Sequence, residues 1–317
     1  MRLYGKERLK ARLDDIAAKG RLPHAILLHG EQGIGKKTLA KYIAKLFLCG
    51  APPCDSCPAC RNIDAGAHPD VIFVKQQCGG KYSLDSFREV MTGSVVKPNN
   101  GSLKIYVIED CDNMPANQRV LLQNTLLKLV EEPADYLRFI FTCENVSSVI
   151  ETILSRVTEF EVPAASVEEC AACLMEGEFT PKKAMDLAQM FSGNIGKCRA
   201  VLDGGEETKL IDTAVKAAGA VARMDKYSFA AALSEQTGRP EYNETLNHLC
   251  GILRDALALK CGGEAISFGK NEAAGIAKAF SEEFILSMLD SVFEVSANSS
   301  YNLNLALTTA YLTSRLF

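Results

Sequence analysis

The sequence predicts an α/β domain built on a parallel sheet with helices on both faces, followed by all-helical parts. Three observations predict this fold class. Short apolar segments alternate with helical patterns up to about residue 163, which is typical of parallel strands covered on both faces. A glycine-rich loop within HGEQGIGKKTLA, residues 29–40, joins the first apolar segment to a helix. After residue 163 only amphipathic helical patterns broken by glycines remain.

The expected elements follow from apolar periodicity and from turn residues. The first half should hold a helix, a strand, the loop with its helix, and three further strands. The turn KPNNG lies just before the second of these three strands. The expected helices of the first half are 6–20 and 36–48. The expected strands are 25–30, 70–74, 104–110 and 138–143, with the turn at 97–101. The later helices include 166–176, 180–194 and 305–317.

Composition sets limits on the function. The chain has 317 residues and a formal net charge of −4, which suggests two or three domains and gives no sign of a strongly basic nucleic-acid-binding protein. Residues 1–15 contain no apolar signal-peptide core. The uncharged segment 295–314 is interrupted by Asn, Ser and Thr, so it predicts a packed helix instead of a membrane span. Twelve cysteines without a secretion signal indicate reduced thiols, a metal site, or both, in the cytoplasm.

The glycine-rich loop nearly completes a phosphate-binding motif. Gly30, Gly35 and Lys36 fill the frame G-x-x-x-x-G-K-[ST]. In that frame backbone N–H groups surround the phosphates, the lysine reaches the β- and γ-phosphates, and a hydroxyl holds Mg²⁺. Here the hydroxyl position is Lys37, and Thr38 comes one residue late. A glycine-rich turn that binds nothing is the alternative interpretation.

Two acids, Glu109 and Asp110, end the strand in KIYVIEDCDNM. At the carboxyl edge of a parallel sheet, one such acid can hold Mg²⁺ through water and the next can polarise an attacking water. Their order is the reverse of the usual Asp-Glu, and the shorter Asp110 is poorly suited to reach that water. Solvated acids at the end of a strand are the alternative interpretation.

Four cysteines are spaced as a metal-binding module. The pattern Cys49-x4-Cys54-x2-Cys57-x2-Cys60 can supply four thiolates to one Zn²⁺. The Cys-Pro that a bacterial iron–sulfur motif requires after its third cysteine is absent, because RNIDAGA follows Cys60. We therefore expect a closed, structural zinc site over 49–60, with free thiols or an iron–sulfur cluster as alternatives.

The order of these segments resembles one family. GRLPHAILLHGEQGIGKKTLA, the four-cysteine insert, KIYVIEDCDNM, LLQNTLLKLVEEP, RFIFTCEN and ILSRV occur in the order found in bacterial DNA polymerase III clamp-loader subunits of the delta-prime type, AAA+ proteins related to tau/gamma. The resemblance covers residues 1–165, and the later helices match by layout only. It implies a RecA-like AAA+ domain over 1–164, a helical lid over 165–207 and an all-helical collar domain for oligomerisation over 208–317.

The resemblance also implies roles for single residues. Ser155-Arg156 matches the family's Ser-Arg-Cys motif with Val157 in place of the cysteine. It implies that Arg156 acts in trans, as an arginine finger in the ATP site of a neighbouring tau/gamma subunit, where a planar, permanent cation suits phosphate oxygens. Thr142 matches the sensor-one position. The nucleotide-binding residues implied are Gly30, Gly33, Gly35, Lys36, Lys37, Thr38, Glu109, Asp110 and Thr142.

The chain departs from an active ATPase at the sensor-two position, where Gly196 stands in place of the arginine of tau/gamma-like chains. Together with Lys37 and the reversed acids, this predicts weak nucleotide binding and little or no hydrolysis by the isolated chain. The expected cofactor is structural Zn²⁺, and ATP with Mg²⁺ is only weakly supported.

The function that the resemblance implies is that of a delta-prime subunit in the DNA polymerase III holoenzyme. Its partners would be tau/gamma, delta, the sliding β clamp and, through the assembled complex, primer-template DNA, without membrane contact. Two alternatives are an active tau/gamma-like clamp-loader ATPase and a zinc-stabilised, non-enzymatic adaptor. A complete Gly-Lys-Thr and a sensor-two arginine would favour the first, and both are missing. The Ser155-Arg156 pair argues against the second.

Overall fold

The computed structural model describes residues 3–74, 84–112, 126–177, 179–236, 238–297 and 304–317. The chain divides into two compact units, one made of 1–188 and 192–196 and the other of 189–191 and 197–317. The predicted lid lies mostly in the first unit. Its separation as a third domain, with boundaries at 164 and 207, stays a prediction.

The first unit is built on a five-stranded parallel sheet, so the predicted fold class is confirmed. The sheet order is β2-β3-β4-β1-β5, and every pairing is parallel. Parallel pairing brings the carboxyl ends of the strands to one edge of the sheet, and the loop that follows β1 begins at that edge. The strands are β1 (Ala25–His29), β2 (Val71–Val74), β3 (Lys104–Ile108), β4 (Leu137–Cys143) and β5 (Thr158–Glu161).

Among the described strands, only the edge strand β5 is not predicted by the sequence pattern. Its four residues are TEFE, and of these only Phe160 is buried. An edge strand with a single buried position carries no apolar run, so its pattern cannot be told from a loop. Pairing with β1 decides its conformation.

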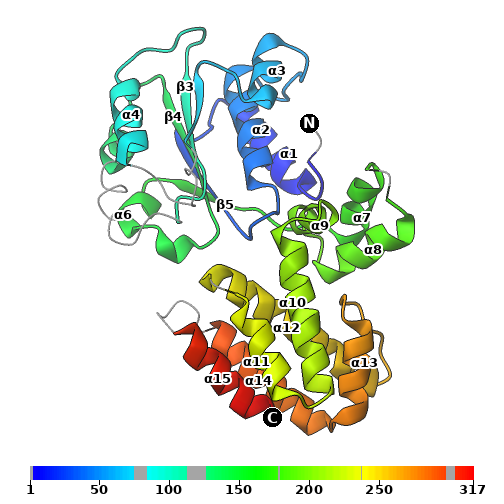
Figure 1. The fold of residues 1–317 in the computed structure, drawn as a ribbon. Helices are drawn as coiled ribbons and strands as arrows, with labels where there is room; N and C mark the ends of the chain where they lie inside the picture. Colours follow the sequence, from blue (N-terminus) through cyan, green and yellow to red (C-terminus); the bar gives the residue numbers. More distant parts are fainter. Residues whose placement is uncertain (1–2, 75–83, 113–125, 178, 237, 298–303) are drawn as a thin grey trace. The chain divides into compact units, whose positions relative to one another are not determined.

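Helices cover both faces of the sheet (Figure 1). Alternate residues of each strand point to opposite faces, so Ile26 and Leu28 belong to one buried cluster and Leu27 to the other. One face packs against α1 (Glu7–Ala18), α2 (Lys36–Leu48) and α3 (Pro58–Ala65). The other face packs against α4 (Leu84–Ser94), helical residues 126–131 and α6 (Glu151–Leu154).

The segment VSSVIETIL, residues 146–154, does not form a single helix. Val146–Ser148 forms a 3₁₀ turn capped by the Asn145 side chain, and α6 begins only at Glu151. Val149 and Ile150 between them have extended backbone. The Val149 side chain is buried in the same cluster as Ile153 of α6, so burial against the sheet interrupts the helix.

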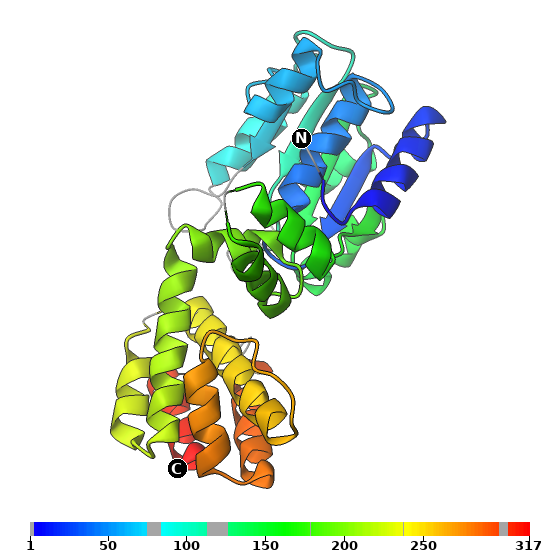
Figure 2. The ribbon, with the colours of Figure 1, turned by 90° about the vertical axis from the view of Figure 1, so that its right-hand side faces the viewer.

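The described residues after β5 form helices and the segments that connect them, as predicted. Figure 2 shows α10 to α15 of the second unit side by side. Ala214, Ala217 and Ala218 of α10 are fully buried, and such small side chains let α10 pack against α11, α12 and α13. The helices are α7 (Val167–Met175), α8 (Pro181–Met190), α9 (Ile195–Leu202), α10 (Glu206–Ala222), α11 (Lys226–Ser234), α12 (Arg239–Lys260), α13 (Lys270–Ala279), α14 (Glu282–Ala297) and α15 (Leu305–Leu316).

The segment 295–314 is not one helix, which corrects the expectation for it. α14 ends at Ala297, and α15 begins at Leu305, where the Asn304 side chain accepts hydrogen bonds from the first turn. Asparagine is a strong helix N-cap, and this explains the new start. Among the described helices, none has the length and apolarity that crossing a bilayer requires.

Candidate functional site

The candidate phosphate loop joins β1 to α2. Gly35 precedes the first residue of α2 with φ +98°, a left-handed conformation that favours glycine. No side chain caps the first turn of α2. The N–H groups of that turn, with the positive end of the helix dipole, are therefore available to an anion.

Lys36 is turned onto the loop itself. Its side-chain Nζ donates hydrogen bonds to the carbonyl oxygens of Gly30 and Glu31 at 2.5 and 2.8 Å, and the residue is 6% exposed. Burial lowers the pKa of Lys36, opposed by the charges of Asp110, Glu144 and Asp112. The Lys36 ammonium thus binds backbone oxygens of the phosphate loop itself.

Lys37 binds both acids at the end of β3. Its Nζ lies 3.0 Å from Glu109 Oε2 and 3.2 Å from Asp110 Oδ2. Burial alone would lower the pKa of Lys37, but the hydrogen bond that it donates to Glu109 and the charges of both acids outweigh it and raise that pKa. The structure therefore brings Lys37, Glu109 and Asp110 together, as their motif positions predict. Thr38 lies one position further along α2 and is half-buried.

Thr142 lies beside the same acids, at the end of the adjacent strand β4. It is fully buried. Its Oγ1 accepts a hydrogen bond from the backbone N–H of Asp110 at 2.8 Å and donates to Asp110 Oδ1 at 3.4 Å. Asp110 has φ +51°, a conformation that aspartate tolerates better than most residues. Thr142 thus fixes the turn that presents the two acids.

The segment 192–196 lies directly on the phosphate loop, within the first unit. The Gly196 N–H donates to the carbonyl oxygen of Gly33 at 2.9 Å. Asn194, which is 1% exposed, donates from Nδ2 to the carbonyl oxygen of Gln32 at 2.8 Å. A Cβ on Gly196 would lie 2.5 Å from Gly33 Cα and from its oxygen. No side chain fits at 196 while this contact is made.

The four cysteines 49, 54, 57 and 60 form one cluster. All four Sγ atoms lie within 4.8 Å of one another, and those of Cys49 and Cys54 are 3.5 Å apart. A tetrahedral Zn²⁺ with Zn–S bonds of about 2.3 Å has Sγ–Sγ edges of roughly 3.8 Å. The cysteine donor set and its spacing therefore fit zinc.

Backbone donors surround the sulfur atoms of this cluster. The N–H groups of Cys54, Cys57 and Cys60 point at the Sγ atoms of Cys49, Cys54 and Cys57 at 3.3–3.4 Å. Hydrogen bonds, first those from Ser56, lower the pKa of Cys54 to about 6. Burial raises the pKa of Cys60 to about 12. Four thiolates here therefore need a cation, and Zn²⁺ would provide it while releasing protons.

Lys45 connects this cluster to α2, and the sequence analysis does not identify it. Its Nζ lies 2.6 Å from Asp55 Oδ1, inside the cysteine loop, and 2.8 Å from Asp64 Oδ2 on α3. The Lys45 side chain is 2% exposed. Burial would lower its pKa, but the hydrogen bonds and charges of the two aspartates raise it. Its place on the apolar face of α2 is the one sequence signal, since a lysine there needs acidic partners.

We expect Lys45→Met to lower the free energy of unfolding by about 1–3 kcal/mol, because two acids lose their buried cation while the apolar stem is kept. The lower end applies if water reaches Asp55, whose side chain is 48% exposed. Urea unfolding measures the change. The matched control is Lys19→Met, which removes an exposed pair with Asp15 and should change stability by less than about 1 kcal/mol. Equal effects of the two substitutions would contradict the role of Lys45.

Arg156 lies two residues after the end of α6, in the first unit. One guanidinium nitrogen donates to the Thr152 carbonyl oxygen and to Ser155 Oγ, each at 2.8 Å. The other lies 2.8 Å from Glu131 Oε1. The side chain is 38% exposed. The guanidinium is therefore held in position near the surface and accessible to another molecule.

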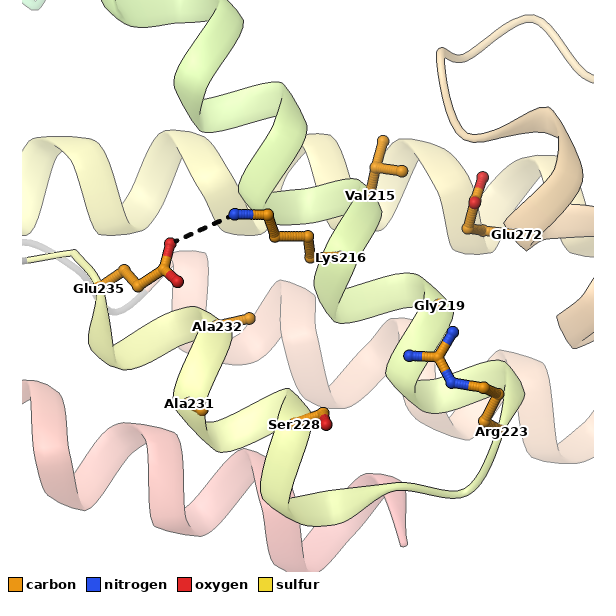
Figure 3. Close-up of a pocket in the computed structure, with 9 residues that line it drawn as sticks. All are labelled: Val215, Lys216, Gly219, Arg223, Ser228, Ala231, Ala232, Glu235 and Glu272. Carbon is orange, nitrogen blue, oxygen red and sulfur yellow. Dashed lines mark ion pairs between the residues drawn. The ribbon is translucent and has the colours of Figure 1, made fainter.

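The second unit has a surface cavity and a mixed cluster, neither of which contains a predicted site residue. The cavity, of about 420 Å³, lies between α10, α11 and α13, and the Lys216–Glu235 ion pair borders it (Figure 3). The cluster consists of Glu207, Glu244 and His248, with side-chain donor atoms that could face one metal ion. However, the Lys197 ammonium is already paired with Glu244.

Sequence spacing locates the phosphate loop and the cysteine cluster but not their supports. The contacts of Lys45 and Asn194 were missed because they depend on tertiary packing. Cys111 and Cys143 are buried, as expected; Cys78 lies outside the described residues.

Comparison with known proteins gives consistent matches over the first half of the chain. A family model described as DNA polymerase III, delta subunit matches residues 5–166. The DNA polymerase III subunit delta' of Bacillus subtilis is 32% identical over 177 residues, which cover 54% of this chain and 52% of that protein. The DNA polymerase III subunit tau of Escherichia coli is 29% identical over 171 residues, which cover 53% and 26% of the two chains.

The matched part thus spans about half, or less, of the length of these curated relatives. Among solved structures, a DNA polymerase III gamma subunit-related protein from Thermotoga maritima is 16% identical with a TM-score of 0.44. The match covers 99% of this chain and 100% of that one.

Proposed function

Because this chain belongs to the family of DNA polymerase III clamp-loader subunits that includes delta' and tau/gamma, we propose that it serves as the delta-prime subunit. In this role it joins tau/gamma and delta in the cytoplasm, and the complex places the sliding β clamp on primer-template DNA. The chain itself hydrolyses little or no ATP. The division into an AAA+ domain, a lid and an oligomerising collar is part of the same proposal.

The contact of Gly196 with the phosphate loop carries this proposal. An active subunit of the resembling type would present a sensor-two arginine at this position. Here a Cβ alone would meet Gly33 at 2.5 Å, and the next residue, Lys197, is paired with Glu244. Without the sensor-two arginine, one of the cations that stabilise charge on the γ-phosphate in the transition state is missing. This supports a subunit that does not use its own loop for hydrolysis.

Arg156 gives the chain a catalytic role at a neighbouring site. A finger has to be partly exposed, always charged and held by its own chain, and Arg156 meets these conditions through Thr152, Ser155 and Glu131. We propose that it contacts the phosphates of ATP bound to an adjacent tau/gamma subunit. The four-cysteine cluster, in the same proposal, holds a structural Zn²⁺.

The alternatives are less well supported. An active tau/gamma-like ATPase needs a Mg²⁺-binding hydroxyl after Lys36, where the chain has Lys37. A zinc-stabilised adaptor outside replication explains the cysteine cluster, but it does not explain why Arg156 is held in position near the surface.

Reconstitution with tau/gamma and delta tests the assignment. We expect the full-length chain to co-purify with both in one complex and to be required for DNA-stimulated ATP hydrolysis and clamp loading. Co-purification without any dependence of loading on this chain would favour the adaptor. Rapid ATP hydrolysis by the isolated chain, at the rate of tau/gamma, would favour the active ATPase.

A further inference from the structure

The position of Lys37 has a consequence beyond the loss of a hydroxyl. In loops of this frame, Mg²⁺ lies between the residue that follows the lysine and an acid at the end of a neighbouring strand. Here the Lys37 ammonium occupies that region, 3.0 Å from Glu109 Oε2 and 3.2 Å from Asp110 Oδ2. It contacts both acids at once.

The Lys37 ammonium partly balances the negative charges of Glu109 and Asp110. The Glu109 side chain is 8% exposed, and a buried carboxylate requires a cation close by. Lys37 provides one, because its ammonium lies within ion-pair distance of both acids. The ammonium is covalently attached to α2, so it stays close to the acids at a high effective concentration.

Mg²⁺ does not fit the site in this form. The ion needs oxygen ligands in near-octahedral geometry at about 2.0–2.1 Å, and a protonated lysine has no lone pair to offer. A divalent ion would also lie directly against the ammonium. Binding the metal therefore requires Lys37, whose side chain is 55% exposed, to leave both acids for solvent.

We propose that the Lys37 ammonium is the built-in cation of this phosphate loop and stands in place of a divalent metal ion. The state of the loop is then independent of Mg²⁺, and any phosphate or nucleotide bound at the start of α2 is bound without the metal. This inference deepens the proposed function, because it gives a cause for the low ATP hydrolysis. Only this link to hydrolysis rests on the proposed function. Its test uses the isolated chain, so it can fail or hold separately from the assembly.

The test replaces Lys37 by the residue type that the motif ordinarily has. In Lys37→Thr the hydroxyl and the two freed acids should create a metal site. We expect the affinity for fluorescently labelled ATP to become about tenfold tighter in Mg²⁺ than in Mg²⁺-free buffer without chelator, equivalent to ~1.4 kcal/mol. In the presence of ATP, thermal unfolding of this variant should occur about 2–4 °C higher with Mg²⁺ than without it, while the cysteine cluster keeps its zinc in both conditions. The wild-type chain should show equal affinities, or no binding, and equal unfolding temperatures in both conditions.

Two further variants keep the test decisive. Lys37→Arg keeps a cation at the acids and should stay insensitive to Mg²⁺. Lys216→Thr makes the same substitution at the exposed pair with Glu235 in the second unit, and it should also leave the metal response unchanged. A wild-type affinity for ATP that Mg²⁺ improves about tenfold overturns the proposal even if Lys37→Thr does not fold. So does a folded Lys37→Thr that ignores the metal.

Discussion

Cys60→Ser is expected to abolish zinc binding and to lower the stability of the first unit more than any other single change considered. Cys60 lies on α3 and is fully buried, and its sulfur is one of four in the cluster. Structural zinc contributes apparent free energies of about 10–16 kcal/mol in zinc-finger peptides. If only ~3 kcal/mol of this is lost here, unfolding of a unit of this size should occur about 6–12 °C lower. Metal analysis of the purified chain and thermal unfolding measure both effects.

The control for Cys60→Ser is Cys198→Ser, a buried cysteine in the second unit. It should cost some packing energy without changing the metal content. Chelation of zinc from the wild-type chain should reproduce the Cys60→Ser effect and loosen residues 49–66, which hydrogen exchange would detect. Wild-type protein that contains no zinc, or contains iron instead, would count against the assignment.

Arg156→Ala is expected to have the largest effect on activity. Arginine fingers contribute about 10³–10⁵ in rate at the site they serve. The loss for the whole reconstituted complex should be smaller, because other tau/gamma sites keep their own arginines. DNA-stimulated ATP hydrolysis and clamp loading should both fall. Folding should hardly change, because the partly exposed pair with Glu131 contributes at most about 1 kcal/mol.

Two variants separate a finger from a simple ion pair. Glu131→Ala removes the same pair but leaves the guanidinium, still held by Thr152 and Ser155, so loading should fall much less than in Arg156→Ala. Arg156→Lys keeps a charge but lacks the planar fork, so it should not rescue fully. If Glu131→Ala is as defective as Arg156→Ala, the pair matters for structure and the finger is wrong. Wild-type loading by the Arg156→Ala complex would lead to the same conclusion.

The sequence by itself determined the features that are written within short stretches of chain. Apolar segments predicted β1 to β4. The central strands β1, β3 and β4 are buried on both faces and read as apolar runs, and the edge strand β2 has the apolar sequence VIFV as well. The spacing of Cys49, Cys54, Cys57 and Cys60 predicted their cluster, since a short loop and one helix turn bring such neighbours together. The glycine frame predicted the loop between β1 and α2.

Only the tertiary structure decided which distant groups meet. Lys37 contacts Glu109 because β3 ends and α2 begins at the same edge of the sheet, and Gly196 contacts Gly33 because the segment 192–196 packs on the loop. Neither contact leaves a periodic pattern in the sequence. The strand β5 and the buried Lys45 also depend on distant residues. The strand forms by pairing with β1, and the lysine is buried because Asp55 and Asp64 balance its charge. Local patterns specify elements, whereas pairings between distant elements depend on register and packing, which no short stretch of sequence contains.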